Sequence, residues 1–283
     1  MGRGCVLLTV AVAGCNSIFG LAPTHEMEPA IPGLFMPPAG PTTCAGAPDF
    51  ATWQYTPHVV AGTPGVLHPT FLTADRVVFM MQGHLFESGL DGGVVRLTSL
   101  ELYDGENLAS PAAGPGGDVI WFLRLYGSSQ GLYYATRDAD GWAQARTDFG
   151  VISEQVQPGT VGFYDGTGRM VIAMQRTSMD RGRLVELESE DGLSWTQLDT
   201  LPFSDGSVSM YDPALSADGC FVLYSVYGNA TNDLYVAARG GDGVFAAPVH
   251  LDKAAGGAQP AIDPSLHELW FNQLGGGLVQ ATP

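Results

Sequence analysis

The sequence contains few charged residues, and very few of them are basic. Its 283 residues include 12 Lys and Arg against 29 Asp and Glu, which gives a formal net charge of −17. Nucleic acids and anionic lipid surfaces attract proteins through Lys and Arg, which replace their counterions. The composition therefore argues against a nucleic-acid partner, and it suits a protein kept soluble outside the cell by an acidic surface.

Motifs for metals, cofactors and common catalytic centres are also missing. The 6 histidines include neither a His-x-His nor a His-Glu-x-x-His spacing, so we expect no metal site. There is no Walker phosphate loop, no Gly-x-Ser-x-Gly elbow and no dinucleotide fingerprint. We therefore expect no cofactor. The abundant glycine, 38 residues, is explained by tight turns.

Long apolar runs are absent, and the one short run lies at the amino terminus. Residues 5–13 follow a positively charged lead and are too few to span a bilayer as a stable anchor. The run ends in Val12-Ala13-Gly14-Cys15, which resembles the lipobox of bacterial lipoprotein signal peptides. The resemblance implies that residues 1–14 are removed and that Cys15 is lipidated. An ordinary secretory signal with a chance cysteine is the alternative.

A lipid on Cys15 would hold the protein on a membrane of the bacterial envelope. Asn16 follows the cysteine, which in the enterobacterial sorting pattern favours the outer membrane over the inner one. Residues 15–47 are rich in Pro and Gly and show no sustained apolar period, so we expect a tether. Residues 48–283 are long enough for one large domain with a full core.

Cysteine is scarce, and the predicted processing leaves one possible pair. Cys5 falls in the signal peptide and Cys15 carries the lipid, so Cys44 and Cys220 remain. An oxidising compartment would permit a disulfide between them. Two unpaired buried thiols are the alternative.

The rest of the chain repeats one pattern at intervals of about 40 to 55 residues, the length of a β-propeller blade. Each unit opens at a proline, then has a short strand, a tight turn and a strongly apolar strand that suits burial on both faces. The opening prolines are Pro69, Pro111, Pro158, Pro213 and Pro260. The apolar second strands are expected at 77–80, 119–122, 170–173, 221–224 and 268–271.

Third and fourth strands complete each unit except the last. Third strands are expected at 84–87, 131–134, 183–186, 233–236 and 277–280, and outer fourth strands at 94–97, 142–147, 195–198 and 245–251. The fifth unit lacks an outer strand, whereas residues 50–60 form an outer-strand pattern without a blade. We therefore predict an all-β fold, a five-bladed β-propeller of four-stranded antiparallel blades whose last blade is completed by the amino-terminal strand.

The fourth unit carries a family resemblance. Residues 212–219 read Asp-Pro-Ala-Leu-Ser-Ala-Asp-Gly, followed by an apolar strand and Asp-Leu-Tyr-Val at 233–236. This resembles the TolB-type (WD40-like) propeller repeat, whose core is Pro-x-x-Ser-Pro-Asp-Gly, with Ala217 in place of the second proline. The other units match more loosely, and TolB has six blades. The resemblance implies an envelope protein that binds partners with its propeller.

Propeller topology predicts where a ligand would bind. Fourth-to-first and second-to-third connections share one face, where the residues before the opening prolines should ring the channel mouth. These ring residues are His68, Ser110, Gln157, Asp212 and Gln259. Nearby candidates are Tyr211, Arg124, Tyr126, Arg176, Asp104 and Glu106. Polar residues also suit a wet channel that binds nothing, so the ring has a structural reading as well. Cys44 and Cys220 are expected on the opposite face.

The preferred functional prediction is a binding or scaffolding module for a protein or glycan partner, and not an enzyme. The alternative is a five-bladed furanosidase-type glycoside hydrolase, which needs two carboxylates converging at the channel. The ring offers one carboxylate, Asp212, with Asp104, Glu106 and Asp205 on loops. A second carboxylate about 5–10 Å from Asp212 would favour the enzyme.

Overall fold

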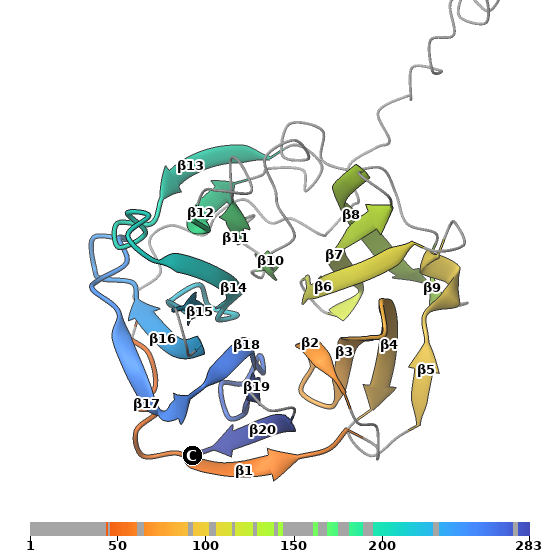
Figure 1. Cartoon of the computed structure of the whole chain (residues 1–283), viewed down its shortest axis with the longest axis horizontal. Helices are drawn as coiled ribbons and strands as arrows, with labels where there is room; N and C mark the ends of the chain where they lie inside the picture. The colour runs from red at the N-terminus through yellow and green to blue at the C-terminus, as the bar shows by residue number, and fades with distance from the viewer. Residues whose placement is uncertain are drawn as a thin grey trace, which may run out of the picture.

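The computed structural model describes residues 44, 46–60, 65–89, 93–101, 106–114, 117–126, 129–138, 141–143, 161–163, 169–174, 181–188, 195–228, 232–273 and 277–283. In these ranges the chain forms five four-stranded antiparallel sheets arranged as blades around a centre (Figure 1). The prediction of a five-bladed propeller is confirmed. No helix in the described ranges is long and apolar enough to cross a membrane.

Each blade runs from an innermost strand to an outer strand. Blade 1 contains β2 (Leu67–Thr73), β3 (Arg76–Met81), β4 (His84–Gly89) and β5 (Val94–Arg96), followed by the short 3-10 helix η1 (Thr98–Leu100). Blade 2 contains β6 (Asn107–Ala113), β7 (Val119–Tyr126), β8 (Ser129–Asp138) and β9 (Gly141–Trp142). Blade 3 contains β10 (Val161–Phe163), β11 (Arg169–Met174), β12 (Arg183–Glu188) and β13 (Thr196–Thr200). Blade 4 contains β14 (Ser209–Leu215), β15 (Phe221–Tyr227), β16 (Asn232–Ala238) and β17 (Val249–Ala255).

Blade 5 is built from both ends of the described chain. Its inner strands are β18 (Gly257–Ile262), β19 (Leu269–Gln273) and β20 (Gly277–Thr282), and its outer strand is β1 (Gln54–His58). β1 pairs antiparallel with β20, with Gln54 opposite Thr282 and His58 opposite Leu278. The predicted closure is therefore confirmed, and Figure 1 shows β1 running beside the carboxyl terminus.

The apolar second strands supply most of the core, as their sequence predicts. Val77, Val78 and Phe79 of β3 are fully buried, as are Phe221 and Val222 of β15. Successive side chains of a strand point to opposite faces, so such runs pack against the neighbouring blade on each side. The innermost strands β2, β6, β10, β14 and β18 contact one another around the centre, which holds the residues before the opening prolines in place.

One outer strand lies later in the chain than its sequence pattern indicates. The sequence pattern predicts 245–251 for blade 4, whereas β17 is Val249–Ala255 and Phe245 forms an isolated bridge with Arg239. Pro248 has no backbone N–H, so a regular ladder cannot run through it. The strand therefore begins after the proline.

The two cysteines that remain after the predicted processing are joined in a disulfide. The Cα atoms of Cys44 and Cys220 are 5.2 Å apart, and Cys220 is buried at the turn between β14 and β15. First-to-second turns lie on the face opposite the channel mouth. The disulfide thus ties the segment before β1 to blade 4.

Candidate functional site

The four described ring residues share one unusual backbone conformation. His68, Ser110, Asp212 and Gln259 have φ values of 45°, 51°, 55° and 55°. In all four innermost strands the pairing register shifts at this point, as it does in a β-bulge. Left-handed backbone is uncommon for residues other than Gly. Its recurrence in four blades indicates that the propeller geometry imposes it.

His68 and Gln259 are joined across the closure between blades 1 and 5. The Gln259 side-chain oxygen Oε1 accepts a hydrogen bond from the His68 backbone N–H (3.1 Å). The amide nitrogen Nε2 must therefore be the atom that lies 2.9 Å from Nε2 of the His68 ring. An amide nitrogen only donates, so Nε2 of the imidazole accepts and the proton of the neutral ring sits on Nδ1.

Asp212 of β14 lies on the other side of this histidine. Its Oδ1 is 3.9 Å from Nδ1 of His68, and its Oδ2 accepts a hydrogen bond of 2.8 Å from the hydroxyl of Tyr227. Burial, together with the nearby carboxylate, raises the pKa of Tyr227, which keeps the phenol protonated as a donor. Burial lowers the pKa of His68, opposed by the charge of Asp212, so the ring is neutral, as the hydrogen bond from Gln259 to its Nε2 requires.

Aromatic packing and buried hydroxyls surround this group. The ring of Tyr211 meets that of Tyr227 edge to face, with centroids 5.0 Å apart. A Cβ added at Gly182 would lie 2.7 Å from the Tyr211 ring, so this glycine permits the approach of the tyrosine. Ser225 accepts a hydrogen bond from the Gln259 backbone through its hydroxyl (3.1 Å). The remaining described ring residue, Ser110 in β6 of blade 2, is also buried.

Arg124 is a correction to the predicted set. It was expected in a loop near the mouth, but it lies in β7 with its side chain 4% exposed. Its Nε is 3.1 Å from Oε2 of the buried Glu106, and its Nη2 donates to the carbonyl of Leu100 (2.7 Å). A buried guanidinium needs such partners. Arg124 and Glu106 therefore join β7 to the segment before β6, and do not present charge to a ligand.

Several predicted residues lie outside the part of the chain that the structure describes. These are Cys15, Asp104, Gln157 and Arg176, together with the side chain of Tyr126. Within the described residues, no group of three or more His, Cys, Asp or Glu could hold a metal ion.

Sequence reasoning missed Tyr227, which holds the ring carboxylate. The apolar pattern of the second strand in blade 4 predicts a strand over 221–224, but β15 continues to Tyr227. The continuation Ser225-Val226-Tyr227 in the sequence was the available signal, because alternation persists there. The three extra residues reach the face on which Asp212 lies.

The described geometry offers one ring carboxylate for chemistry. Among the four described ring residues only Asp212 is acidic, and its Oδ2 is engaged by Tyr227. Glu106 pairs with Arg124, and Asp205 accepts from the backbone of Ser207 on an exposed loop (2.7 Å). The side chains of this group can donate and accept hydrogen bonds to a polar ligand.

Comparison with known proteins supports the architecture. No family model and no curated protein sequence matches the chain. Among solved structures, the α-L-arabinofuranosidase PaAbf62A from Podospora anserina has a TM-score of 0.55 at 12% identity, over 82% of this chain and 98% of that one. The catalytic domain of the GH62 α-L-arabinofuranosidase from Coprinopsis cinerea has a TM-score of 0.51 at 12% identity, over 81% and 96%.

TolB from Agrobacterium tumefaciens is also similar in structure, with a TM-score of 0.50 at 13% identity over 74% of this chain and 69% of that one. The chain is therefore a β-propeller that is similar in structure to TolB. At these identities the likeness shows the fold alone, because one fold can carry unrelated functions. The chain is a five-bladed β-propeller whose structural neighbours include TolB and α-L-arabinofuranosidases.

Proposed function

We propose that this chain is a lipid-anchored protein of the bacterial envelope whose propeller binds a protein or glycan partner at the channel mouth. The lipobox-like residues 12–15 support the anchor, and the TolB-like repeat at 212–219 supports the envelope location. The binding surface is the group formed by His68, Asp212 and Gln259. No catalytic step is assigned to it.

One observation carries the proposal: the ring carboxylate Asp212 is held by Tyr227 and faces a neutral histidine. Such a network fixes donors and acceptors in place, and this preorganisation favours selective binding of a polar partner. The edges of Tyr211 and Tyr227 add aromatic surface, which binding sites for proteins and sugars share.

The second candidate is a furanosidase-type glycoside hydrolase, favoured by the fold likeness to two arabinofuranosidases. That chemistry needs an acid and a second carboxylate flanking the scissile bond. A direct test is incubation of the full-length protein with p-nitrophenyl α-L-arabinofuranoside and with arabinoxylan. We expect no release of sugar above buffer. Release by the wild type that Asp212→Asn abolishes would replace the binding proposal with the hydrolase.

Site-specific photo-crosslinking tests a protein partner. Val208 precedes β14 on the mouth face and is 38% exposed, whereas Val244 lies in the β16–β17 connection on the opposite face and is 50% exposed. Both valines of the full-length chain are replaced, one at a time, by p-benzoylphenylalanine in the native host. We expect an ultraviolet-dependent adduct from position 208 and none from position 244.

Binding to a glycan partner is tested by the migration of the protein in native gels that contain polysaccharide from the cell envelope. Retarded migration of the wild type, lost in His68→Ala, would support recognition at the mouth. If neither valine position gives an adduct and no polysaccharide retards the protein, the binding proposal is wrong. Equal adducts from both faces would also contradict it, because the mouth would then have no special role.

A further inference from the structure

A glutamate, an arginine and an aromatic ring together join blades 1 and 2 at their outer edge. Glu87 of β4 accepts a hydrogen bond of 2.9 Å from Nη1 of Arg137 in β8. The Arg137 guanidinium also lies over the ring of Trp142 in β9, 5.3 Å from its centroid. The indole N–H of Trp142 donates to the other oxygen of Glu87 (2.8 Å). We call this arrangement an inter-blade clamp.

The same clamp joins blades 3 and 4. Glu186 of β12 accepts from Nη2 of Arg239 (2.7 Å), and Arg239 lies 4.1 Å from the ring centroid of Phe245. The two arginines are equivalent in the repeat, because the backbone N–H of each donates to the end of the first-to-second turn in its own blade. A feature that recurs in this way belongs to the fold, so the clamp itself is structural.

The two clamp arginines differ in what their guanidinium groups bind. Arg239 is 10% exposed, and its Nε and Nη1 donate to the carbonyls of Gly219 (3.0 Å) and Gly243 (2.7 Å). Arg137 is 26% exposed, and its one side-chain hydrogen bond to a described residue is the bond from Nη1 to Glu87. The edge formed by Nε and Nη2 of Arg137 is therefore left with its donors available.

A second arginine shares the Glu87 carboxylate with Arg137. Arg76 of β3 also donates to Oε1 of Glu87, through Nε (2.9 Å) and Nη2. One carboxylate thus faces two guanidinium groups, a local surplus of positive charge in a chain of net charge −17. An anion that enters here can approach the free edge of the Arg137 guanidinium. Both oxygens of the nearby Glu87 carboxylate already accept hydrogen bonds from Arg137 and Trp142.

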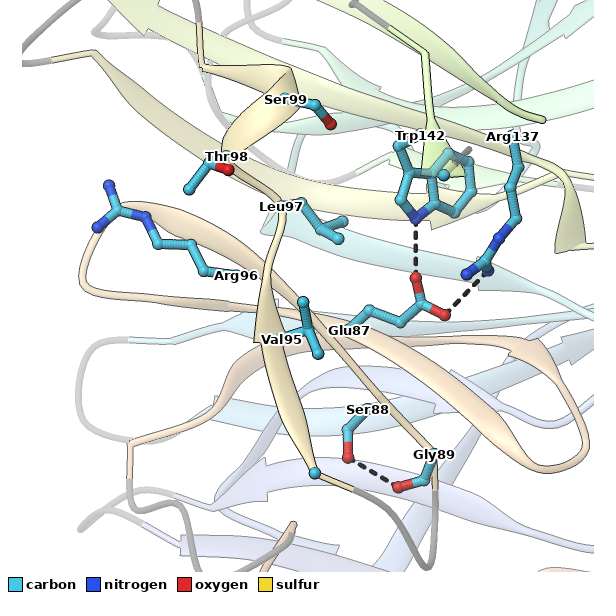
Figure 2. A pocket seen from close by; sticks show the side chains of 12 residues that line it. Glu87, Ser88, Gly89, Val95, Arg96, Leu97, Thr98, Ser99, Arg137 and Trp142 are labelled. Carbon is cyan, nitrogen blue, oxygen red and sulfur yellow. Dashed lines mark hydrogen bonds and ion pairs between the residues drawn. The ribbon is translucent and has the colours of Figure 1, made fainter. Parts of the chain in front are cut away.

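A cavity of about 340 Å³ lies next to this edge. It is bounded by β4, β5, η1, β8 and β9, where the outer strands of blades 1 and 2 approach each other. Figure 2 shows Glu87, Arg137 and Trp142 joined by their hydrogen bonds on one side, with Thr98 and Ser99 above. The lining runs from Gly141 and the β4–β5 connection to Leu97, Thr98 and Ser99 after β5, so the cavity lies along the outer edge of blades 1 and 2.

The chemistry of the walls defines a ligand class. The fork of an arginine edge matches a carboxylate through two parallel hydrogen bonds. The exposed hydroxyls of Thr98 and Ser99 suit a ligand that carries hydroxyl groups of its own. The volume falls in the range of small-molecule sites, roughly 300–1,000 Å³.

We propose that this cavity binds an acidic sugar, a uronate, whose carboxylate pairs with the Nε–Nη2 edge of Arg137 while Thr98 and Ser99 hold its hydroxyls. The site lies at the outer edge of blades 1 and 2, whereas the His68 group lies on the innermost strands of the ring. It stands whether or not the channel mouth binds a partner.

Isothermal titration calorimetry of the full-length protein tests the proposal with D-galacturonate, D-galactose and inorganic phosphate. We expect saturable binding of D-galacturonate and none of D-galactose. Arg137→Gln should weaken binding at least about tenfold, the loss of one charge-assisted pair. Arg239→Gln is the matched control, because it breaks the equivalent clamp without touching the cavity, and it should leave the affinity unchanged.

A filling variant covers the case in which Arg137→Gln fails to fold. Gly93 lines the cavity, and a Cβ placed there meets no atom within 4 Å. Gly93→Trp therefore occupies the space while leaving the clamp in place, and it should abolish galacturonate binding in a protein with wild-type circular dichroism. Absence of saturable binding to the wild type, or binding that survives in Gly93→Trp, would overturn the proposal. Equal affinity for galactose or phosphate would overturn the assignment of an acidic sugar.

Discussion

Removal of the Cys44–Cys220 disulfide should destabilise the propeller mainly through the unfolded chain. The two residues are 176 positions apart, so the bond closes a very long loop in the denatured state. The chain-entropy treatment gives about 5 kcal/mol for such a loop, and measured losses for native disulfides are typically about 2–5 kcal/mol. We therefore expect the double variant Cys44→Ser/Cys220→Ser to lose at least about 2 kcal/mol in free energy of unfolding.

The native ring should survive the loss of the bond. The segment carrying Cys44 leads to Phe50 and Trp53, both buried in the core between blades 4 and 5, and then to β1, which pairs with β20 along its length. These contacts do not depend on the sulfur atoms. The near-ultraviolet circular dichroism of the double variant should therefore match that of the wild type.

Urea unfolding followed by tryptophan fluorescence measures the effect. The midpoint should fall, and the slope m should rise because the uncrosslinked denatured chain exposes more surface. A thiol titration in denaturant, with and without reductant, checks that the wild type holds the bond. If the bond is present and its removal costs less than about 1 kcal/mol with no change in m, the loop-entropy reasoning is wrong. Loss of the native spectrum would show instead that the bond holds β1 in place.

Three further predictions concern the anchor, the mouth and the clamp. Cys15→Ala should move the protein from the membrane fraction to the soluble fraction and abolish palmitate labelling. Burial lowers the pKa of His68, so at low pH the unfolded chain binds a proton at this residue that the folded chain does not. The free energy of unfolding, measured by urea titration at a series of pH values, should therefore fall as pH drops below about 6.5. This dependence on pH should be weaker in His68→Gln. Glu186→Ala leaves the Arg239 guanidinium buried without its carboxylate, and should cost about 3 kcal/mol in the same unfolding assay.

The fold could be predicted because it depends on local and repeated signals. The buried second strands appear as uninterrupted apolar runs such as 119–122, and the missing outer strand of the last blade could be inferred by counting. The exact place of β17 could not be inferred from apolar pattern alone, because Pro248 ends the possible ladder within an otherwise suitable run.

The site was harder to predict because its contacts are distant in sequence. His68 and Gln259 are 191 positions apart, and Glu87 and Arg137 are 50 apart. Topology brought His68 and Gln259 to one face as neighbours, but no local pattern indicates which side chains will bond. Arg124 shows the opposite problem, since a polar residue near a loop suggested exposure whereas the fold supplies Glu106 as a buried partner.

Repetition within the chain separates fold from function more reliably than polarity does. The left-handed backbone before the opening prolines recurs in four blades, and the clamp recurs in two, so the propeller geometry accounts for both. Two features do not recur among the described residues. One is the hydrogen-bonded pair of His68 and Gln259 beside Asp212, and the other is the open edge of Arg137 beside its cavity. The propeller fold does not by itself require one interface to differ from its counterparts. Selection for a ligand gives a reason for such a difference. One feature lies on the innermost strands and the other at the outer edge of the ring, which makes the two proposed sites separable by mutation.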